Sequence, residues 1–308
     1  MRTTRKLAVL AAALIGTVGA LAVAPAAQAA APPASLGTFQ LLAAANYHYV
    51  NVAYESWPGE WDVAWPNARD PQTEGTHFTF RDAGDGDIAI VQVNGSLLTL
   101  VSEAEPLRWR QPATPQNPDE IVDAQRFRIV PNSDGTISLR NKVNGKHVSA
   151  ENKGAAPLHA NRDSVGPWEK FRRFAAGSAP GPVLAYVNQQ YVSADSAGTK
   201  PLIAKRPEIG LWEHFFVEDL GNGEIALKSL VNGKYVCAEA RGAQPLIANR
   251  DAVGPWETFK LVRNTDGTQS LIAKINGKYV SAESAGTKPL IASRTAIGVW
   301  ERFDIHAL

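Results

Sequence analysis

The stretch NGKYVSAESAGTKPLIASRTAIGVWERF, from Asn276 to Phe303, decides the fold. Its pattern recurs three times upstream, each time 44 residues earlier and without a gap. Every copy has an Asn, an Arg, a Trp-Glu pair and a Phe at matching places. The asparagines are Asn144, Asn188, Asn232 and Asn276, the arginines Arg162, Arg206, Arg250 and Arg294, and the tryptophans Trp168, Trp212, Trp256 and Trp300. A fixed period of this length is the signature of a repeat protein.

Two looser copies precede these four. They open at Asn46 and Asn94, and neither has the Trp-Glu pair. Within each unit, short β-branched and aromatic runs alternate with Gly, Asn and Asp turns, which predicts four strands at hairpin spacing. No segment of this region has a convincing helical period. We therefore predict an all-β chain of six four-stranded repeats of roughly 44 residues.

The junctions between repeats distinguish two architectures, a six-bladed propeller and two tandem β-trefoils. Four of the five junctions carry an Asp-Gly or Asn-Gly turn. The third reads AAGSAPGP instead, over residues 175–182, and small residues with Pro and Gly are typical of a linker. This three-plus-three punctuation predicts one β-trefoil at 36–174 and a second at 183–308.

The N-terminal residues have the composition of a targeting segment. Three basic residues precede an apolar run from Leu7 to Val23, and Ala27-Gln28-Ala29 follows. This predicts a secretory signal peptide at 1–29, a short linker at 30–35 and an extracellular protein. The run is short for a membrane span, and no later run is longer. The signal peptide holds three of the 31 basic residues, so 28 remain against 30 acidic ones, which does not favour nucleic acid as a partner.

The motifs of the last four repeats resemble those of the fascin-like β-trefoil family. The resemblance rests on the Gly-Lys-Tyr-Val-Ser-Ala-Glu segment, the Ala-Asn-Arg segment, the Trp-Glu-x-Phe strand and the Asp-Gly turn, and it covers nearly all of Phe39–Leu308. The family includes cytoplasmic actin-bundling proteins, and similar domains occur in secreted bacterial proteins, where sugar binding is the usual inference. With its signal peptide, this chain is similar to the secreted branch.

Residues present in every repeat are expected to support the fold. We expect the tryptophans of the Trp-Glu pairs to close the base of each barrel or cap its core. The repeated arginines recur with an acidic residue eleven positions earlier, and a salt bridge to that carboxylate is the expected role. A place in a ligand pocket is the alternative role. The four acidic residues are Glu151, Asp195, Glu239 and Glu283.

The pattern does not point to catalysis. Glycoside hydrolysis needs two dissimilar carboxylates flanking one bond, whereas most acidic residues here recur with the repeat. The six histidines are scattered without metal-ligand spacing. Cys237, the only cysteine, stands where three other copies have Ser. We expect a protein that is not an enzyme and that carries neither a cofactor nor a metal.

An insertion in the first repeat holds the candidate ligand-binding residues. Trp57 and Trp61 lie there, with Glu55 and Asp62 beside them. Indole rings flanked by carboxylates are typical of a small-ligand site, here for a sugar. The alternative is that the loop folds its tryptophans back onto the barrel. Trp109 in the second repeat is a weaker candidate for ligand binding.

Trp65, at the end of this insertion, is assigned to the core. Aligned on Arg69, it falls where Leu158 stands in the third repeat. Together these features favour a secreted, lectin-like protein that binds a polysaccharide or a glycoprotein glycan without catalysis. Binding or bundling of actin filaments is the second hypothesis, and a purely structural surface protein is the third.

Overall fold

The computed structural model describes residues 34–53, 62–112 and 120–307. They form 24 β-strands and six short 3-10 helices. Within these ranges, no helix has the length and apolar character needed to cross a membrane. The 3-10 helices are η1 (Asp123–Gln125), η2 (Asn152–Gly154), η3 (Pro167–Glu169), η4 (Leu211–Glu213), η5 (Ala240–Gly242) and η6 (Val299–Glu301).

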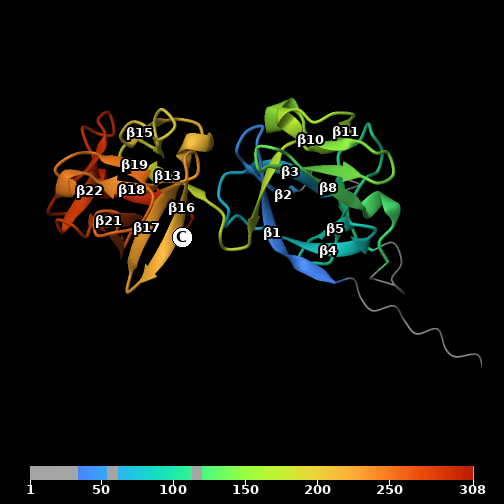
Figure 1. Ribbon diagram of the computed structural model, residues 1–308, viewed down its shortest axis with the longest axis horizontal. Helices are drawn as coiled ribbons and strands as arrows, with labels where there is room; N and C mark the ends of the chain where they lie inside the picture. The colour runs from blue at the N-terminus through green and yellow to red at the C-terminus, as the bar shows by residue number, and fades with distance from the viewer. Residues whose placement is uncertain (1–33, 54–61, 113–119, 308) are drawn as a thin grey trace, which may run out of the picture. The chain divides into compact units, whose positions relative to one another are not determined.

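The strands divide into two sheets of twelve, coloured blue to green and yellow to red in Figure 1. The first sheet contains β1 (Ser35–Ala43), β2 (Tyr49–Ala53), β3 (Val63–Ala68), β4 (Phe78–Gly84), β5 (Asp87–Val91), β6 (Leu97–Thr99), β7 (Arg108–Arg110), β8 (Phe127–Pro131), β9 (Ile137–Asn141), β10 (His147–Ala150), β11 (Leu158–Arg162) and β12 (Phe171–Ala175). The second contains β13 (Gly181–Ala185), β14 (Gln190–Ser193), β15 (Ile203–Arg206), β16 (His214–Gly221), β17 (Glu224–Ser229), β18 (Tyr235–Ala238), β19 (Leu246–Arg250), β20 (Phe259–Arg263), β21 (Gln269–Ala273), β22 (Lys278–Ala282), β23 (Leu290–Arg294) and β24 (Phe303–Ile305).

Each successive group of four strands is one repeat, so repeats 1 to 3 build the first sheet and repeats 4 to 6 the second. The sheets close on themselves, because β1 pairs with both β12 and β4, and β13 pairs with both β24 and β16. Three four-stranded units closed in this way are the arrangement of a β-trefoil. The prediction of an all-β chain of six four-stranded repeats is confirmed.

Each sheet encloses its own hydrophobic core. The Phe that opens the last strand of repeats 3 to 6 is at most 1% exposed. These residues are Phe171, Phe215, Phe259 and Phe303. Replacing such a buried Phe by Ala costs about 3–5 kcal/mol. Backbone hydrogen bonds also join the repeats of the second sheet, since Leu202 N–H donates to the Leu246 carbonyl and Leu290 N–H to the Leu202 carbonyl, both at 2.8 Å.

The tryptophans of the Trp-Glu pairs lie outside these cores, contrary to the expectation that they cap them. All four are only partly buried. The reason is local, because in three of the four repeats the Trp stands in the 3-10 helix that precedes the last strand, and Phe takes the inward position three residues later. The buried Glu of each pair is 4–5% exposed and serves the loop instead.

Two assignments among the tryptophans of the first sheet are also corrected. Trp109 is core, 4% exposed and stacked on Phe78 with 4.9 Å between ring centroids, so it is not a ligand-binding residue. Trp65 is half-buried and outside the core. The strand register explains the second error: Ala64 pairs with Val52 just as Leu158 pairs with Ala150. Trp65 is therefore one position away from the core position assigned to it.

Candidate functional site

The loop before the last strand of a repeat is held by a buried glutamate. In repeat 6, Glu301 Oε2 accepts a hydrogen bond from the Gly298 N–H at 2.7 Å, which caps the short helix η6. A Cβ on Gly298 would lie 3.0 Å from that oxygen, so glycine is the residue that fits there. The corresponding bond recurs at 2.7–2.9 Å in repeats 3, 4 and 5. This hydrogen bond fixes the backbone of the loop that carries the neighbouring Trp.

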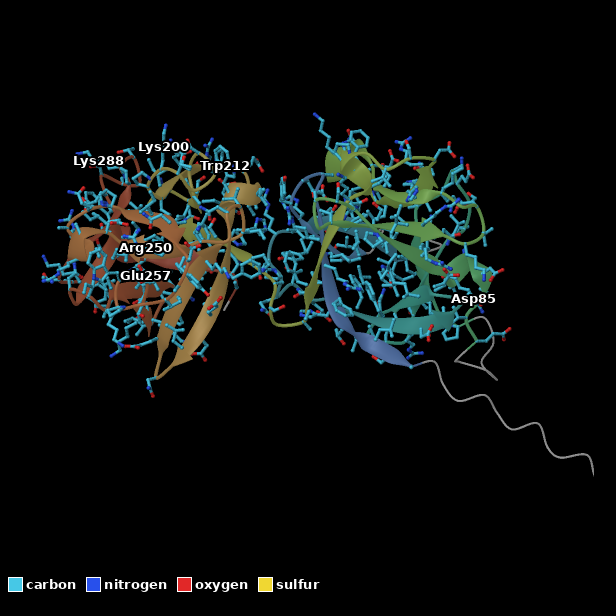
Figure 2. The ribbon with its side chains drawn as sticks, viewed as in Figure 1. Asp85, Lys200, Trp212, Arg250, Glu257 and Lys288 are labelled. Carbon is cyan, nitrogen blue, oxygen red and sulfur yellow. The ribbon has the colours of Figure 1, made fainter. Side chains whose placement is uncertain are left out.

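The repeated arginine bridges two carboxylates. Arg294 Nη2 lies 2.8 Å from Glu283 Oε2, and its Nε lies 4.0 Å from Glu301 Oε1. Arg162, Arg206 and Arg250 make the same two contacts, with the shorter one between 2.7 and 2.9 Å. The expectation that a carboxylate holds each arginine therefore agrees with the geometry of all four loops. Figure 2 labels Arg250 with Glu257, its second partner, whose Oε1 lies 3.8 Å from the arginine Nε.

Two of the four arginines also lie against the neighbouring indole. The guanidinium carbon of Arg206 is 5.4 Å from the centroid of Trp212, and Arg294 stands at the same distance from Trp300. A cation within about 6 Å of an indole is attracted to its face. Both indoles are only partly buried, so they are held in place while part of each remains open to solvent.

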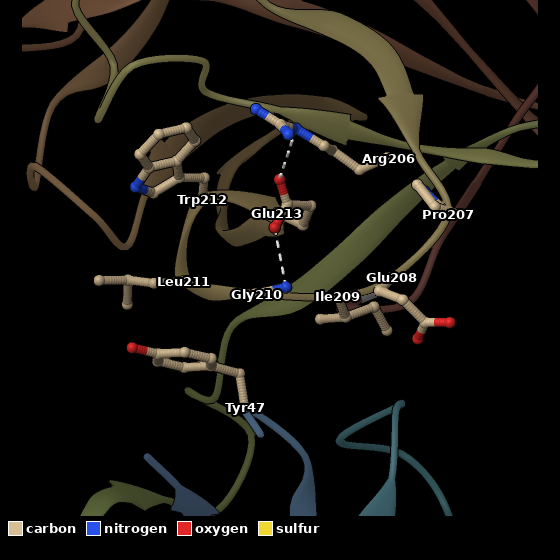
Figure 3. A pocket seen from close by; sticks show the side chains of 9 residues that line it. All are labelled: Tyr47, Arg206, Pro207, Glu208, Ile209, Gly210, Leu211, Trp212 and Glu213. Atoms are coloured by element: carbon tan, nitrogen blue, oxygen red, sulfur yellow. Dashed lines mark hydrogen bonds and ion pairs between the residues drawn. The ribbon is translucent and has the colours of Figure 1, made fainter. Parts of the chain in front are cut away.

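Shallow open pockets lie at these same two loops. The pocket at Trp300 has a volume of about 390 Å³, and Ile297 and Val299 contribute its apolar wall. Figure 3 shows the equivalent place in repeat 4, which Ile209, Leu211 and Trp212 line. In both pockets the Arg–Glu pair supplies polar groups at the edge of the apolar wall. The pockets thus combine an aromatic ring, apolar side chains and fixed hydrogen-bonding groups.

Repeats 3 and 5 carry a different version of this loop. The residue before Trp is Pro167 or Pro255 there, where repeats 4 and 6 have Leu211 and Val299. The residue after the arginine is an aspartate that forms a salt bridge with the lysine after the Asn-Gly turn of the same repeat. In repeat 3, Asp163 lies 2.5 Å from Lys146. Asp251 pairs with Lys234 in the same way. The two kinds of loop therefore alternate along the last four repeats.

The structure does not bring together the residues that the sequence predicted as the ligand site. Glu55, Trp57 and Trp61 lie outside the described residues. Asp62 is half-buried and directly precedes β3. Its backbone carbonyl accepts a hydrogen bond from the backbone N–H of Trp109 at 2.8 Å, and partial burial raises the pKa of its carboxyl. Trp109, in the core, is removed from the candidate site. In the described ranges, no group of three or more His, Cys, Asp or Glu side chains could hold a metal ion.

The apolar pocket residues were not identified from the sequence. Ile209, Leu211, Ile297 and Val299 vary between neighbouring repeats, so a search for residues shared by every copy passes over them. A comparison at twice the repeat length would have found them. At that spacing, SAGTKPLIA recurs at 196–204 and 284–292, followed in both copies by Ile-Gly-x-Trp-Glu.

Comparison with known proteins gives matches among solved structures only. No family model matches the chain, and neither does any curated protein. A designed three-fold symmetric protein, ThreeFoil, is 21% identical over 42% of this chain and 97% of its own, with a TM-score of 0.38. The hemolytic lectin CEL-III is 16% identical over 88% of this chain and 64% of its own, with a TM-score of 0.37.

The Polyporus squamosus lectin, solved with a human-type influenza-binding epitope, is 15% identical over 41% of this chain and 48% of its own, with a TM-score of 0.37. The matched regions thus span less than two thirds of either lectin. Because all these TM-scores are below 0.5, the likenesses carry no argument about fold or function. The fold assignment rests on the strand pairing within each sheet.

Proposed function

We propose that this chain is a secreted, non-catalytic, lectin-like protein that binds sugar rings at the pockets beside Trp212 and Trp300. The observation that carries the proposal is the open pocket at each indole, bordered by a locked Arg–Glu pair. The apolar face of a sugar ring can stack on such an indole while its hydroxyls meet the charged groups. Small-ligand sites typically combine aromatic surface with a few fixed polar groups.

The loop geometry favours binding because its parts are ordered before a ligand arrives. Glu213 and Glu301 each hold both the loop backbone and an arginine, so little conformational entropy is lost on binding. Each shallow pocket alone is suited to weak binding. Two of them in one chain raise the overall affinity for a polymer that can reach both. A polysaccharide or a densely glycosylated protein is therefore the proposed partner.

The fascin-like resemblance supports actin binding as the alternative. An interface with a protein filament typically buries about 800 Å² on each partner. The pocket at Trp300, at about 390 Å³, has instead the volume of a site for one small ligand. A pocket of this volume suits one sugar ring, so sugar is the proposed ligand of these pockets, and actin co-sedimentation tests the alternative directly.

The experiment compares the two kinds of loop within one protein. The mature chain is screened on a glycan array, and the best glycan is titrated into the double variants Trp212→Ala/Trp300→Ala and Trp168→Ala/Trp256→Ala. Loss of the stacking contacts should weaken binding about tenfold or more in the first variant, while the second, matched for repeat position, should bind as the wild type does. Equal effects in both variants, or no glycan bound, would refute the proposal.

The insertion of repeat 1 is the competing location for the site. Trp57→Ala/Trp61→Ala belongs in the same titration for that reason. If this variant loses binding and Trp212→Ala/Trp300→Ala does not, the sugar site lies in the insertion. Thermal melts of all variants show whether a loss of affinity follows from a loss of folded protein.

A further inference from the structure

The charges around the pocket at Trp300 do not balance. Arg294 is the cation of the cluster, and it faces two carboxylates, from Glu283 and Glu301. Ser293 donates a further hydrogen bond to Glu283 at 2.9 Å, and it is uncharged. If both carboxylates are ionised, the cluster carries one net negative charge beside a pocket that is open to solvent.

Arg294 is also poorly placed to receive an acidic ligand. Its Nη2 and Nε donate to the two carboxylate oxygens of Glu283 at 2.8 and 3.1 Å, and Nε also lies 4.0 Å from Glu301 Oε1. An acidic sugar approaching this guanidinium would come close to both carboxylates, and like charges placed together disfavour binding. The indole has the opposite preference, because the face of Trp300 attracts positively charged groups.

From this arrangement we infer that the Trp300 pocket prefers amino sugars, whose protonated amine is a cation, to acidic sugars. The inference rests on the proposed carbohydrate-binding function and adds the class of sugar. The net negative charge attracts the ammonium group, the indole accepts either the ring or the cation, and neutral sugars fall between the two charged classes.

The pocket at Trp212 provides an internal comparison. Lys205 stands there in place of Ser293, and its Nζ lies 3.3 Å from Asp195, the carboxylate that also holds Arg206. This second cation offsets the excess negative charge of the Arg–carboxylate cluster. Glu208 also lines that pocket and adds a negative charge of its own, so the lysine is the one difference to isolate by substitution. The substitution Ser293→Lys transfers this difference into repeat 6 with a residue that the equivalent position already accommodates.

The test uses the full mature chain with Trp212→Ala, so that the Trp300 pocket is the one measured. Three oligosaccharides of equal length are titrated at low salt: one of glucosamine with free amines, one of N-acetylglucosamine, and one of a uronic acid. We expect the amino sugar to bind several-fold more tightly than the neutral one, and the acidic sugar to bind most weakly. Added salt should reduce the advantage of the amino sugar, and so should a pH high enough to deprotonate the amine.

Adding Ser293→Lys should reduce the ratio of amino-sugar to neutral-sugar affinity towards one. The same substitution in repeat 5, Asn249→Lys, is the matched control and should leave the ratio unchanged. An acidic sugar that binds as well as the neutral one, or a ratio insensitive to Ser293→Lys, overturns the inference while leaving sugar binding intact. If none of the three sugars binds, the inference fails, and the glycan array then decides separately whether the proposed function fails too.

Discussion

Gly286, in the last repeat, packs so closely on Asn188, in the fourth, that a Cβ on the glycine would overlap the Nδ2 atom of the asparagine. Asn188 Nδ2 donates to the Ala204 carbonyl at 2.8 Å, so it braces its own repeat as well. Equivalent contacts join repeat 4 to repeat 5 and repeat 5 to repeat 6, which closes a ring of three. The equivalent pairs are Gly198 with Asn232 and Gly242 with Asn276.

The substitution Gly286→Ala tests how much this ring closure stabilises the second sheet. Gly286 has a φ of +81°, and Gly267 has a φ of +86° with open space around it. Alanine at either position suffers the backbone strain of the left-handed region, about 1–2 kcal/mol. Only Gly286→Ala also clashes with Asn188, which should cost about 1–3 kcal/mol more. Urea denaturation of both variants measures the difference, and equal losses would show that the contact does not stabilise the ring.

Residues 179–308 should fold without the rest of the chain. The contact between Gly286 and Asn188 links repeat 6 back to repeat 4, and the pairing of β13 with β24 does the same through the backbone. The fragment therefore has a closed sheet and a core of its own. Circular dichroism and thermal unfolding of the expressed fragment check this. An unfolded fragment, beside a full chain that unfolds cooperatively, would mean that the two halves are not independent domains.

Replacing Arg250 by Ala should destabilise the second sheet without removing the binding at Trp212 and Trp300. The change leaves Glu239 and the buried Glu257 without the cation that they share. The free energy of unfolding should fall by about 1–3 kcal/mol as a result. The low end is expected, because the arginine side chain is 39% exposed. The exposed Arg263 is the control, and its replacement by Ala should change stability little. Unchanged stability with lost sugar binding would place Arg250 in a ligand site instead.

The sequence was informative wherever the fold repeats itself. The 44-residue spacing and the Asp-Gly and Asn-Gly turns suffice to predict the strands, since hairpin geometry depends on a few local residues. The carboxylate partner of each arginine could be predicted for the same reason, because its offset is constant. These features are set by short-range geometry that every copy has to satisfy.

The position of the tryptophans could not be predicted in this way. Interpretation of the Trp-Glu-x-Phe motif as one strand places both Trp256 and Phe259 in a single extended run, whereas β20 begins only at Phe259. The turn before the strand depends on Glu257 accepting a hydrogen bond from the Gly254 N–H, a contact between residues three positions apart that strand periodicity does not reveal. The contact between Gly286 and Asn188 could not be predicted either, because it and its two equivalents depend on packing between residues of different repeats, far apart in the sequence.

His214 gives the chain an acid sensitivity that one substitution should remove. The side chain is 0% exposed, and its Nδ1 lies 2.9 Å from the Gly210 carbonyl oxygen. Burial lowers the pKa of His214 to about 4 from an ordinary value of 6.5. The folded state therefore resists protonation, while the unfolded chain takes up a proton once the pH falls below about 6.5. Stability is unaffected by this group above that pH and decreases as the pH falls towards 4.

Integrated down to about pH 4.5, this difference corresponds to a loss of about 2–3 kcal/mol in the free energy of unfolding relative to neutral pH. His214→Thr should abolish it, since repeat 5 has Thr258 at the same position, with its hydroxyl donating to the Gly254 carbonyl at 2.9 Å. Urea denaturation at neutral pH and at about pH 4.5 gives the acid-induced loss for each protein. That loss should be about 2–3 kcal/mol smaller in the variant, whatever other carboxyl groups contribute to both. Equal losses in the variant and the wild type would mean that His214 is protonated in the folded state.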